Sequence, residues 1–298
     1  MEIARDRGQS VDYEEIIERI ERPSEKAGGD RGVLVGSRKW LIWRRHSHDC
    51  IEGPAAFTID DMARLFAGTS GFSYPAWKPA FYPKDVPAKG FLQYYATRLN
   101  SVEINYTFRQ LPSGKTLEGW LAATSGDFAF SCKAHMRLTH IMKMKDAGSF
   151  TEVFLKSLEP LRAARRLGPI LYQFAPTFKC DAQCLEDYLP LLPNDLRFAF
   201  EFRHASWLTD AVYERLAKHN IALCLAESDR LEVPKVFTAD FGYFRLRKGD
   251  YSEEARHQIA DQVRGLLAGG RDAYVYFKHE EDPNGALWAE ELIRTAQA

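Results

Sequence analysis

Apolar and polar residues alternate along residues 197–203, and this stretch sets the pattern for much of the chain. Its three phenylalanines fall on one side of an extended strand, whereas Ala199, Glu201 and Arg203 fall on the other. The aromatic side suits packing against helices, and buried charges on the other side are costly unless they are paired or used. The pattern predicts a strand of a closed barrel whose polar end forms a functional site.

Seven further stretches have the composition of strands, and helix-like stretches separate them. With 197–203, the predicted strands are 66–72, 101–105, 128–134, 169–174, 222–227, 241–247 and 273–279. The predicted helices are 90–99, 113–124, 150–167, 181–192, 210–220, 252–267 and 284–296, and only the crossover 228–240 lacks one.

This alternation has the length and rhythm of a (β/α)8 TIM-type barrel over residues 62–298. A doubly wound open sheet is the structural alternative. Residues 1–61 do not follow the pattern and are polar, so we interpret them as a poorly ordered N-terminal extension or an artefact of the gene model. In the second case Met62 is a real or alternative start.

Composition narrows the function classes. Hydrophobic residues make up 45% of the 298 residues, enough for a large core, and no apolar run has the length of a membrane span. The N-terminus is charged and predicts no signal peptide, and five scattered cysteines fit reduced thiols. We therefore expect a cytoplasmic protein. Its net charge of −1 gives no whole-protein field that favours nucleic acid or membrane.

Polar residues gather late on one face of the predicted strands. Because parallel strands of a barrel end at the same face, these side chains are expected to meet at the barrel mouth. They are Glu103, Asn105, Lys133, Gln173, Glu201, Arg203, Arg245, Arg247 and Lys278.

The charges in this expected mouth are unequal, with two carboxylates against five cations. Arginine pairs readily with carboxylate or phosphate groups, so an anionic ligand is predicted. A structural ion-pair network is the alternative for Glu103–Lys133 or Glu201–Arg203.

Two loops add candidates beside the mouth. The glycines of 68–71 allow close approach of a ligand, and Tyr74 and Trp77 are a possible stacking platform or a simple cover of the barrel end. The basic loop after the third strand carries His135 and His140, and we take His140 as a candidate general acid/base. A solvated loop is the alternative. A divalent metal held by these histidines with Glu103, Glu201 or Glu227 is less favoured, because the nearby cations oppose it, and no cofactor is predicted.

The same residues resemble the YecE-like family, a domain of unknown function (number 72). The similarity runs in order over about 66–298 and includes 68–74 with Trp77, 81–83, 102–105, 111–112, 133–134, 139–140, 173–174, 201–203 with 206–207, and 274–277. The resemblance implies a TIM-type barrel of uncharacterised biochemistry and supplies no reaction. The chain departs from the family at 278–283, where the Asn/Asp-rich ending common in the family is replaced.

Two functions fit this pattern. The first is an enzyme acting on a phosphorylated or otherwise anionic carbohydrate-like substrate, a hydrolase, lyase or isomerase. Its candidate catalytic residues are Glu103, Lys133, His140 and Glu201, and its candidate substrate-binding residues are Tyr74, Trp77, Asn105, Gln173, Arg203, Trp207, Arg245 and Lys278. The second is nucleic-acid binding or backbone cleavage, with Tyr74, Trp77 and Trp207 stacking on bases. A non-catalytic anion-binding or structural protein is a third reading.

Overall fold

The computed structural model describes residues 62–296, and the predicted extension 1–61 lies outside the described residues. All eight predicted strands are present, and every pairing between them is parallel. They are β1 (Leu65–Thr69), β2 (Ser101–Ile104), β3 (Ala129–Cys132), β4 (Ile170–Gln173), β5 (Phe198–Glu201), β6 (Ala222–Ala226), β7 (Phe241–Leu246) and β8 (Asp272–Phe277).

The strands close into a barrel. Six of them form a sheet in the order β1-β8-β7-β6-β5-β4, and β2 pairs with β3. Bridges between Ser70 and Glu103, and between Lys133 and Leu171, join β2 to β1 and β3 to β4. The TIM-type barrel is therefore confirmed, and the open doubly wound sheet is excluded, because no strand of the described chain is left as a sheet edge.

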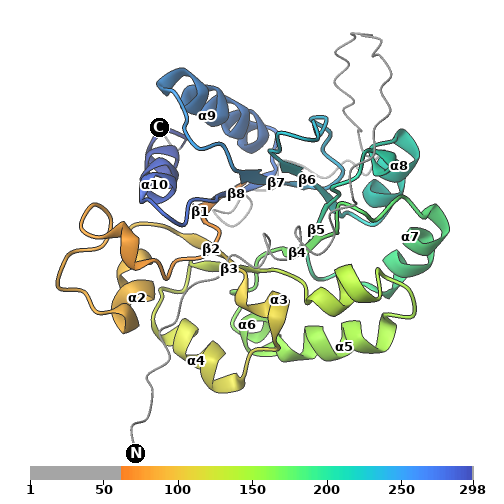
Figure 1. Cartoon of the computed structure of the whole chain (residues 1–298), viewed down its shortest axis with the longest axis horizontal. Coiled ribbons are helices and arrows are strands. Elements are labelled where there is room, and N and C mark those ends of the chain that lie inside the picture. Colours follow the sequence, from red (N-terminus) through yellow and green to blue (C-terminus); the bar gives the residue numbers. More distant parts are fainter. Residues whose placement is uncertain (1–61, 297–298) are drawn as a thin grey trace, which may run out of the picture. The chain divides into compact units, whose positions relative to one another are not determined.

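Helices surround the strands (Figure 1). They are α2 (Phe91–Tyr95), α3 (Tyr106–Arg109), α4 (Gly114–Ala122), α5 (Gly148–Ser157), α6 (Glu159–Ala163), α7 (Ala182–Tyr188), α8 (Asp210–Lys218), α9 (Glu253–Ala268) and α10 (Asn284–Ala296). Ser113 caps α4, as its position predicts. The predicted helix 150–167 is divided into α5 and α6, because Pro160 has no N–H to continue the first helix. The segment 228–240 lacks a helix, as expected.

The strand parity inferred from the sequence is confirmed. Phe198, Phe200 and Phe202 are buried in the core between strands and helices, whereas Ala199 belongs to a separate apolar cluster inside the barrel. Removing each phenylalanine ring from water contributes about 1.5–3 kcal/mol. The inner cluster consists of Phe66, Ala129, Leu171, Ala199, Ala222, Cys224, Ala239, Phe241, Tyr243, Tyr274 and Tyr276.

Two side chains replace backbone pairing at the seam between β1 and β2. The amide of Asn100 accepts from the N–H of Ala67 at 2.8 Å and donates to the carbonyl of Leu65 at 2.7 Å. The hydroxyl of Tyr95 accepts from the N–H of Thr69 at 2.8 Å and donates to the carbonyl of Ser101 at 2.9 Å. These bonds hold the β2–β3 pair in register with the rest of the barrel.

Gly68 permits the close approach at this seam. A Cβ on Gly68 would lie 1.9 Å from the carbonyl oxygen of Ser101, a backbone atom that cannot move aside alone. We therefore expect Gly68→Ala to lower the free energy of unfolding by about 1–3 kcal/mol, as overpacking does. The control is Gly119→Ala in α4, where the added Cβ has no neighbour within 4 Å, and alanine should stabilise the helix. Equal urea midpoints for the two variants would contradict the close approach.

Between residues 62 and 296, no helix has the length and apolar character needed to cross a membrane.

Candidate active site at the carboxyl end of the barrel

Glu103 at the end of β2 is fully enclosed and accepts hydrogen bonds from three side chains. Ser70 Oγ donates to its Oε1 at 2.6 Å, and Tyr243 OH donates to its Oε2 at 2.8 Å. Arg245 donates from Nη2 to Oε1 at 2.8 Å and from Nε to Oε2 at 3.0 Å. Burial first, and then the charge of Glu103, raise the pKa of Tyr243 well above its ordinary value, so its hydroxyl keeps the proton that it donates.

Arg245 also holds a second carboxylate. Its Nη1 donates to Oε2 of Glu201, at the end of β5, at 2.6 Å. The amide of Gln173 on the neighbouring β4 donates to both oxygens of Glu201, at 3.0 and 3.1 Å. One guanidinium thus joins carboxylates from β2 and β5. All three charged side chains are at most 2% exposed, and burial of this kind requires close pairing.

Lys133 extends the cluster from the end of β3. The residue is 2% exposed, and its ammonium lies 4.3 Å from the ring centroid of Phe108 on α3. The hydroxyl of Thr107, also on α3, donates to the carbonyl of Lys133 at 2.7 Å. The short helix that follows β2 therefore fixes the position of Lys133 and supplies a cation–π contact.

His140 also contacts Phe108. It belongs to a π-helical turn, Arg137–Ile141, which the sequence pattern did not predict. Its ring meets that of Phe108 edge to face, with centroids 5.1 Å apart, and its Nδ1 is 2.8 Å from the hydroxyl of Thr139. His140 and Lys133 thus share one aromatic neighbour, and π-helical turns are frequent at functional sites.

Asn105 and Tyr74 adjoin the cluster through Ser70. The amide of Asn105 donates to Ser70 Oγ at 3.0 Å, and the hydroxyl of Tyr74 donates to the Ser70 carbonyl at 2.9 Å. Both residues are half-buried, as are Arg203 and Lys278, which follow the carboxyl ends of β5 and β8. The predicted polar residues therefore share one end of the barrel. Hydrogen bonds join Glu103, Gln173, Glu201 and Arg245 directly, with Asn105 linked through Ser70.

The two tryptophans do not form a ligand platform, and this prediction is wrong. Trp77 is fully buried and stacks on Tyr82 with centroids 5.8 Å apart. Trp207 is fully buried, stacks on Phe202 at 4.5 Å, and donates from its indole N–H to the carbonyl of Phe178 at 2.7 Å. Indole rings without exposed faces fill the core and cannot stack on a base or sugar.

The predicted role of Arg245 also changes. Its guanidinium is directed at two carboxylates of the protein and is 1% exposed, so it is already neutralised before any ligand arrives. Arg245 therefore positions Glu103 and Glu201 rather than holding a substrate anion.

The alternative metal set is not assembled in the part of the chain that the structure describes. No group of three or more histidine, cysteine, aspartate or glutamate side chains is arranged there to hold a metal ion. Both ring nitrogens of His135 are engaged, since Nδ1 accepts from the N–H of Arg137 and Nε2 is 3.1 Å from the carbonyl of Arg109. Burial lowers the pKa of His135.

Sequence reasoning missed three contributors to the site. Ser70 and Tyr243 bind Glu103, and Phe108 lies against Lys133. Tyr243 precedes Arg245 by two residues on β7, so the two side chains point to the same face of the strand. The alternation of the strand could therefore have identified Tyr243. Phe108 lies on a four-residue helix that no periodic pattern revealed.

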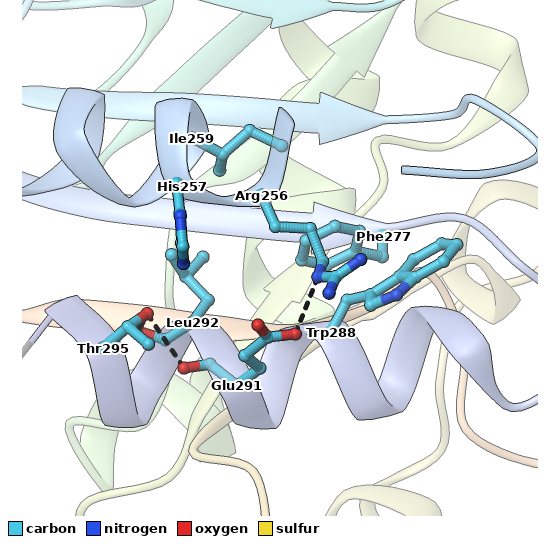
Figure 2. Close-up of a pocket in the computed structure, with 8 residues that line it drawn as sticks. All are labelled: Arg256, His257, Ile259, Phe277, Trp288, Glu291, Leu292 and Thr295. Carbon is cyan, nitrogen blue, oxygen red and sulfur yellow. Dashed lines mark hydrogen bonds and ion pairs between the residues drawn. The ribbon is translucent and has the colours of Figure 1, made fainter. Parts of the chain in front are cut away.

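Two cavities lie apart from this cluster. One of about 10 Å³ lies between α9 and α10, where Arg256 pairs with Glu291 at 2.8 Å, and it has room for no more than about one water (Figure 2). The other, of about 480 Å³, is bordered by residues 144–148 and by α7, where Lys145 pairs with Asp181 at 3.3 Å. None of the predicted site residues lines either cavity.

Comparison with known proteins finds a family model, solved structures and a curated relative that are similar to this chain. The model described as "Protein of unknown function DUF72" matches residues 66–298. A DUF72 family protein from Thermotoga maritima is 28% identical, with a TM-score of 0.70 over 79% of this chain and all of that one. Another, from Enterococcus faecalis, is 18% identical, with a TM-score of 0.64 over 78% of this chain and 96% of that one.

UPF0759 protein YunF from Bacillus subtilis is 27% identical over 143 residues, which are 46% of this chain. The match spans 50% of YunF, about half the length of that relative.

Proposed function

Because the chain belongs to the DUF72 family, whose description names no activity, we propose a function from the geometry of its own barrel. We propose an enzyme that acts by acid/base chemistry on a phosphorylated, carbohydrate-like substrate at the barrel mouth. The observation that carries this proposal is that Glu103, Lys133 and Glu201 are all buried at the carboxyl ends of three different strands. That end carries the active site in characterised enzymes of this fold.

The distribution of charge favours an anionic substrate. Arg245 offsets one of the two carboxylates that it binds and Lys133 the other, so the buried set is formally neutral. Arg203, Arg247 and Lys278 are half-buried and follow the ends of β5, β7 and β8. Glu227 and Glu280 follow the ends of β6 and β8 at the same rim. Arginine and lysine at this rim suit a substrate with a phosphate there and its reacting carbons deeper in the barrel.

Nucleic-acid binding has less support. That reading relied on Tyr74, Trp77 and Trp207 as stacking surfaces, and both tryptophans are fully buried. Recognition of single strands depends on exposed aromatic faces as well as positive charge. The basic loop alone does not distinguish a nucleic acid from a small phosphorylated ligand.

Arg203 provides the test of the anion site. We expect phosphate and phosphorylated sugars to raise the melting temperature of the protein, because a ligand that binds only the native state stabilises it. Arg203→Ala should reduce this rise by at least half, since it removes a charge-assisted contact to the phosphate. Differential scanning fluorimetry over a series of ligand concentrations measures both effects.

Arg271→Ala is the matched control. Arg271 is also half-buried, but it precedes β8 at the opposite end of the barrel, so its removal should leave the ligand response intact. The proposed anion site would be refuted by an absent response in the parent, or by equal responses in the two variants. A stronger response to single-stranded oligonucleotides, with a steep salt dependence, would favour the nucleic-acid reading instead.

A further inference from the structure

We infer that the cavity of about 480 Å³ beside α7 binds a small aliphatic amine, an ammonium group on a short hydrocarbon chain. Two segments border it, the loop from Met144 to Gly148 and the stretch from Asp181 to Leu191, which contains α7. None of the described residues assigned to the proposed function lines this cavity. The two sites are therefore independent, and either can fail without the other.

The volume and the buried lining of the cavity suit a ligand with an apolar part. Sites for small molecules usually have volumes of about 300–1,000 Å³ and a mostly apolar lining. The buried lining here consists of Met144, Ala147, Cys184 and Tyr188, each at most 8% exposed. Leu191, which follows α7, adds an apolar side chain that is 51% exposed and that a hydrocarbon chain would cover.

The polar groups in this buried lining are already bonded within the protein. The hydroxyl of Tyr188 is 2.7 Å from the hydroxyl of Thr151 and 3.0 Å from that of Tyr172. The thiol of Cys184 donates to the carbonyl of Lys143 at 3.5 Å, and burial raises the pKa of this thiol, so it keeps its proton. This part of the cavity therefore calls for hydrocarbon rather than for hydrogen-bonding groups of a ligand.

The charged side chains at the cavity are mostly negative. Asp146, Asp181 and Asp187 line it, together with the ammonium of Lys145. Lys145 pairs with Asp181 at 3.3 Å, and Asp181 also accepts from the backbone N–H of Cys184 at 3.0 Å as the cap of α7. This pair is neutral and structural, so the charge available to a ligand is that of Asp146 and Asp187.

These two carboxylates select a cation. Between residues 62 and 296, neither Asp146 nor Asp187 forms an ion pair, and Asp187 accepts only from the neutral amide of Gln183, at 2.8 Å. The helices α5 and α7 both begin at the cavity, and each contributes about half a positive charge at its amino end. An excess of about one negative charge remains, which matches a single ammonium group.

The loop that borders the cavity is held in place without a ligand. Lys143, Met144 and Asp146 have φ angles of 51°, 70° and 49°, values that residues other than glycine rarely adopt. The N–H of Met144 donates to the carbonyl of Leu138 at 3.0 Å, and the thiol of Cys184 holds the carbonyl of Lys143. A cavity preformed in this way loses little conformational entropy when a ligand enters.

Three ligands with the same chain length and different charge test the inference. Hexylamine, 1-hexanol and hexanoate are titrated into the full chain at neutral pH and low salt, and calorimetry measures the affinities. We expect hexylamine to bind with a dissociation constant below about 1 mM, within reach of a ligand of this size. It should bind about tenfold more tightly than 1-hexanol or hexanoate, and added salt should weaken its binding.

Variants of α7 and of the loop locate the binding. Asp146→Asn combined with Asp187→Asn should weaken hexylamine by about tenfold, because both carboxylates lose their charge. Both residues are exposed, so the fold should persist, and circular dichroism checks this. Glu186→Gln is the matched control, since Glu186 precedes Asp187 on α7, pairs with Arg215 at 3.5 Å and does not line the cavity.

Four outcomes would overturn the inference. They are a dissociation constant for hexylamine above about 1 mM in the parent, equal binding of hexylamine and 1-hexanol, a preference for hexanoate, and equal affinity for hexylamine in the double variant and in Glu186→Gln. A preference for hexanoate would mean that the amino ends of α5 and α7 outweigh the carboxylates. None of these outcomes bears on the response to phosphate at the barrel mouth.

Discussion

Arg245→Met is expected to lower the free energy of unfolding by about 3–5 kcal/mol. Methionine replaces the apolar stem of arginine but lacks the guanidinium, so the change leaves Glu103 and Glu201 as buried carboxylates without their shared partner. Urea unfolding followed by circular dichroism measures the loss.

Arg215→Met is the matched control. Arg215 lies on α8, is 33% exposed and pairs with Glu186 at 3.5 Å, so its loss should change stability by no more than about 1 kcal/mol. A variant of Arg245 as stable as that of Arg215 would mean that the two carboxylates are not buried with their charges. It would also remove the basis for treating Arg245 as a positioning residue.

Trp207→Ala is expected to cost about 3–5 kcal/mol, the range for removing a fully buried aromatic side chain. The indole stacks on Phe202 and Phe174 and donates a hydrogen bond to the Phe178 carbonyl, so its loss leaves both a cavity and an unpaired acceptor. Trp207→Phe keeps an aromatic ring in the same space and should recover most of the stability. Chemical unfolding of the two variants gives both values.

The half-buried Trp120 on α4 is the comparison, because its ring is only partly removed from water and its truncation should cost less. The two roles considered for Trp207 predict opposite results. A ligand platform would leave stability nearly unchanged and abolish binding, whereas a core residue loses stability first. Nearly parental unfolding of Trp207→Ala, together with lost binding, would restore the platform reading.

Periodicity was sufficient to predict the barrel. A strand can be recognised from the order of apolar and polar residues alone, and this order between residues 66 and 279 predicts all eight strands. The elements that were missed or misread are local. The four-residue helix α3 is too short to show a period, and a π-helical turn has no sequence rule. The break between α5 and α6 had a readable cause in Pro160.

The sequence predicted which residues belong to the site but not which of them bind one another. Parity and strand ends identified Glu103, Gln173, Glu201 and Arg245, because parallel strands bring their carboxyl ends together. Which cation binds which carboxylate depends on side-chain reach across the barrel, and Arg245 crosses from β7 to β2 and β5. Trp77 and Trp207 were wrongly predicted to face a ligand, because they follow strands in connecting segments. The alternation within strands does not show whether a side chain in such a segment is buried or exposed.

The seam between β1 and β2 makes closure of this barrel depend on the identity of particular residues. A backbone ladder survives almost any substitution other than proline, because every other residue supplies the same N–H and C=O groups. Here Asn100 and Tyr95 supply part of the pairing, so a substitution of either side chain would remove hydrogen bonds that hold the two strands together. Glu103 lies on β2 and Lys133 follows β3. Substitutions at Asn100 and Tyr95, which lie outside the site, can therefore displace the charged groups of Glu103 and Lys133.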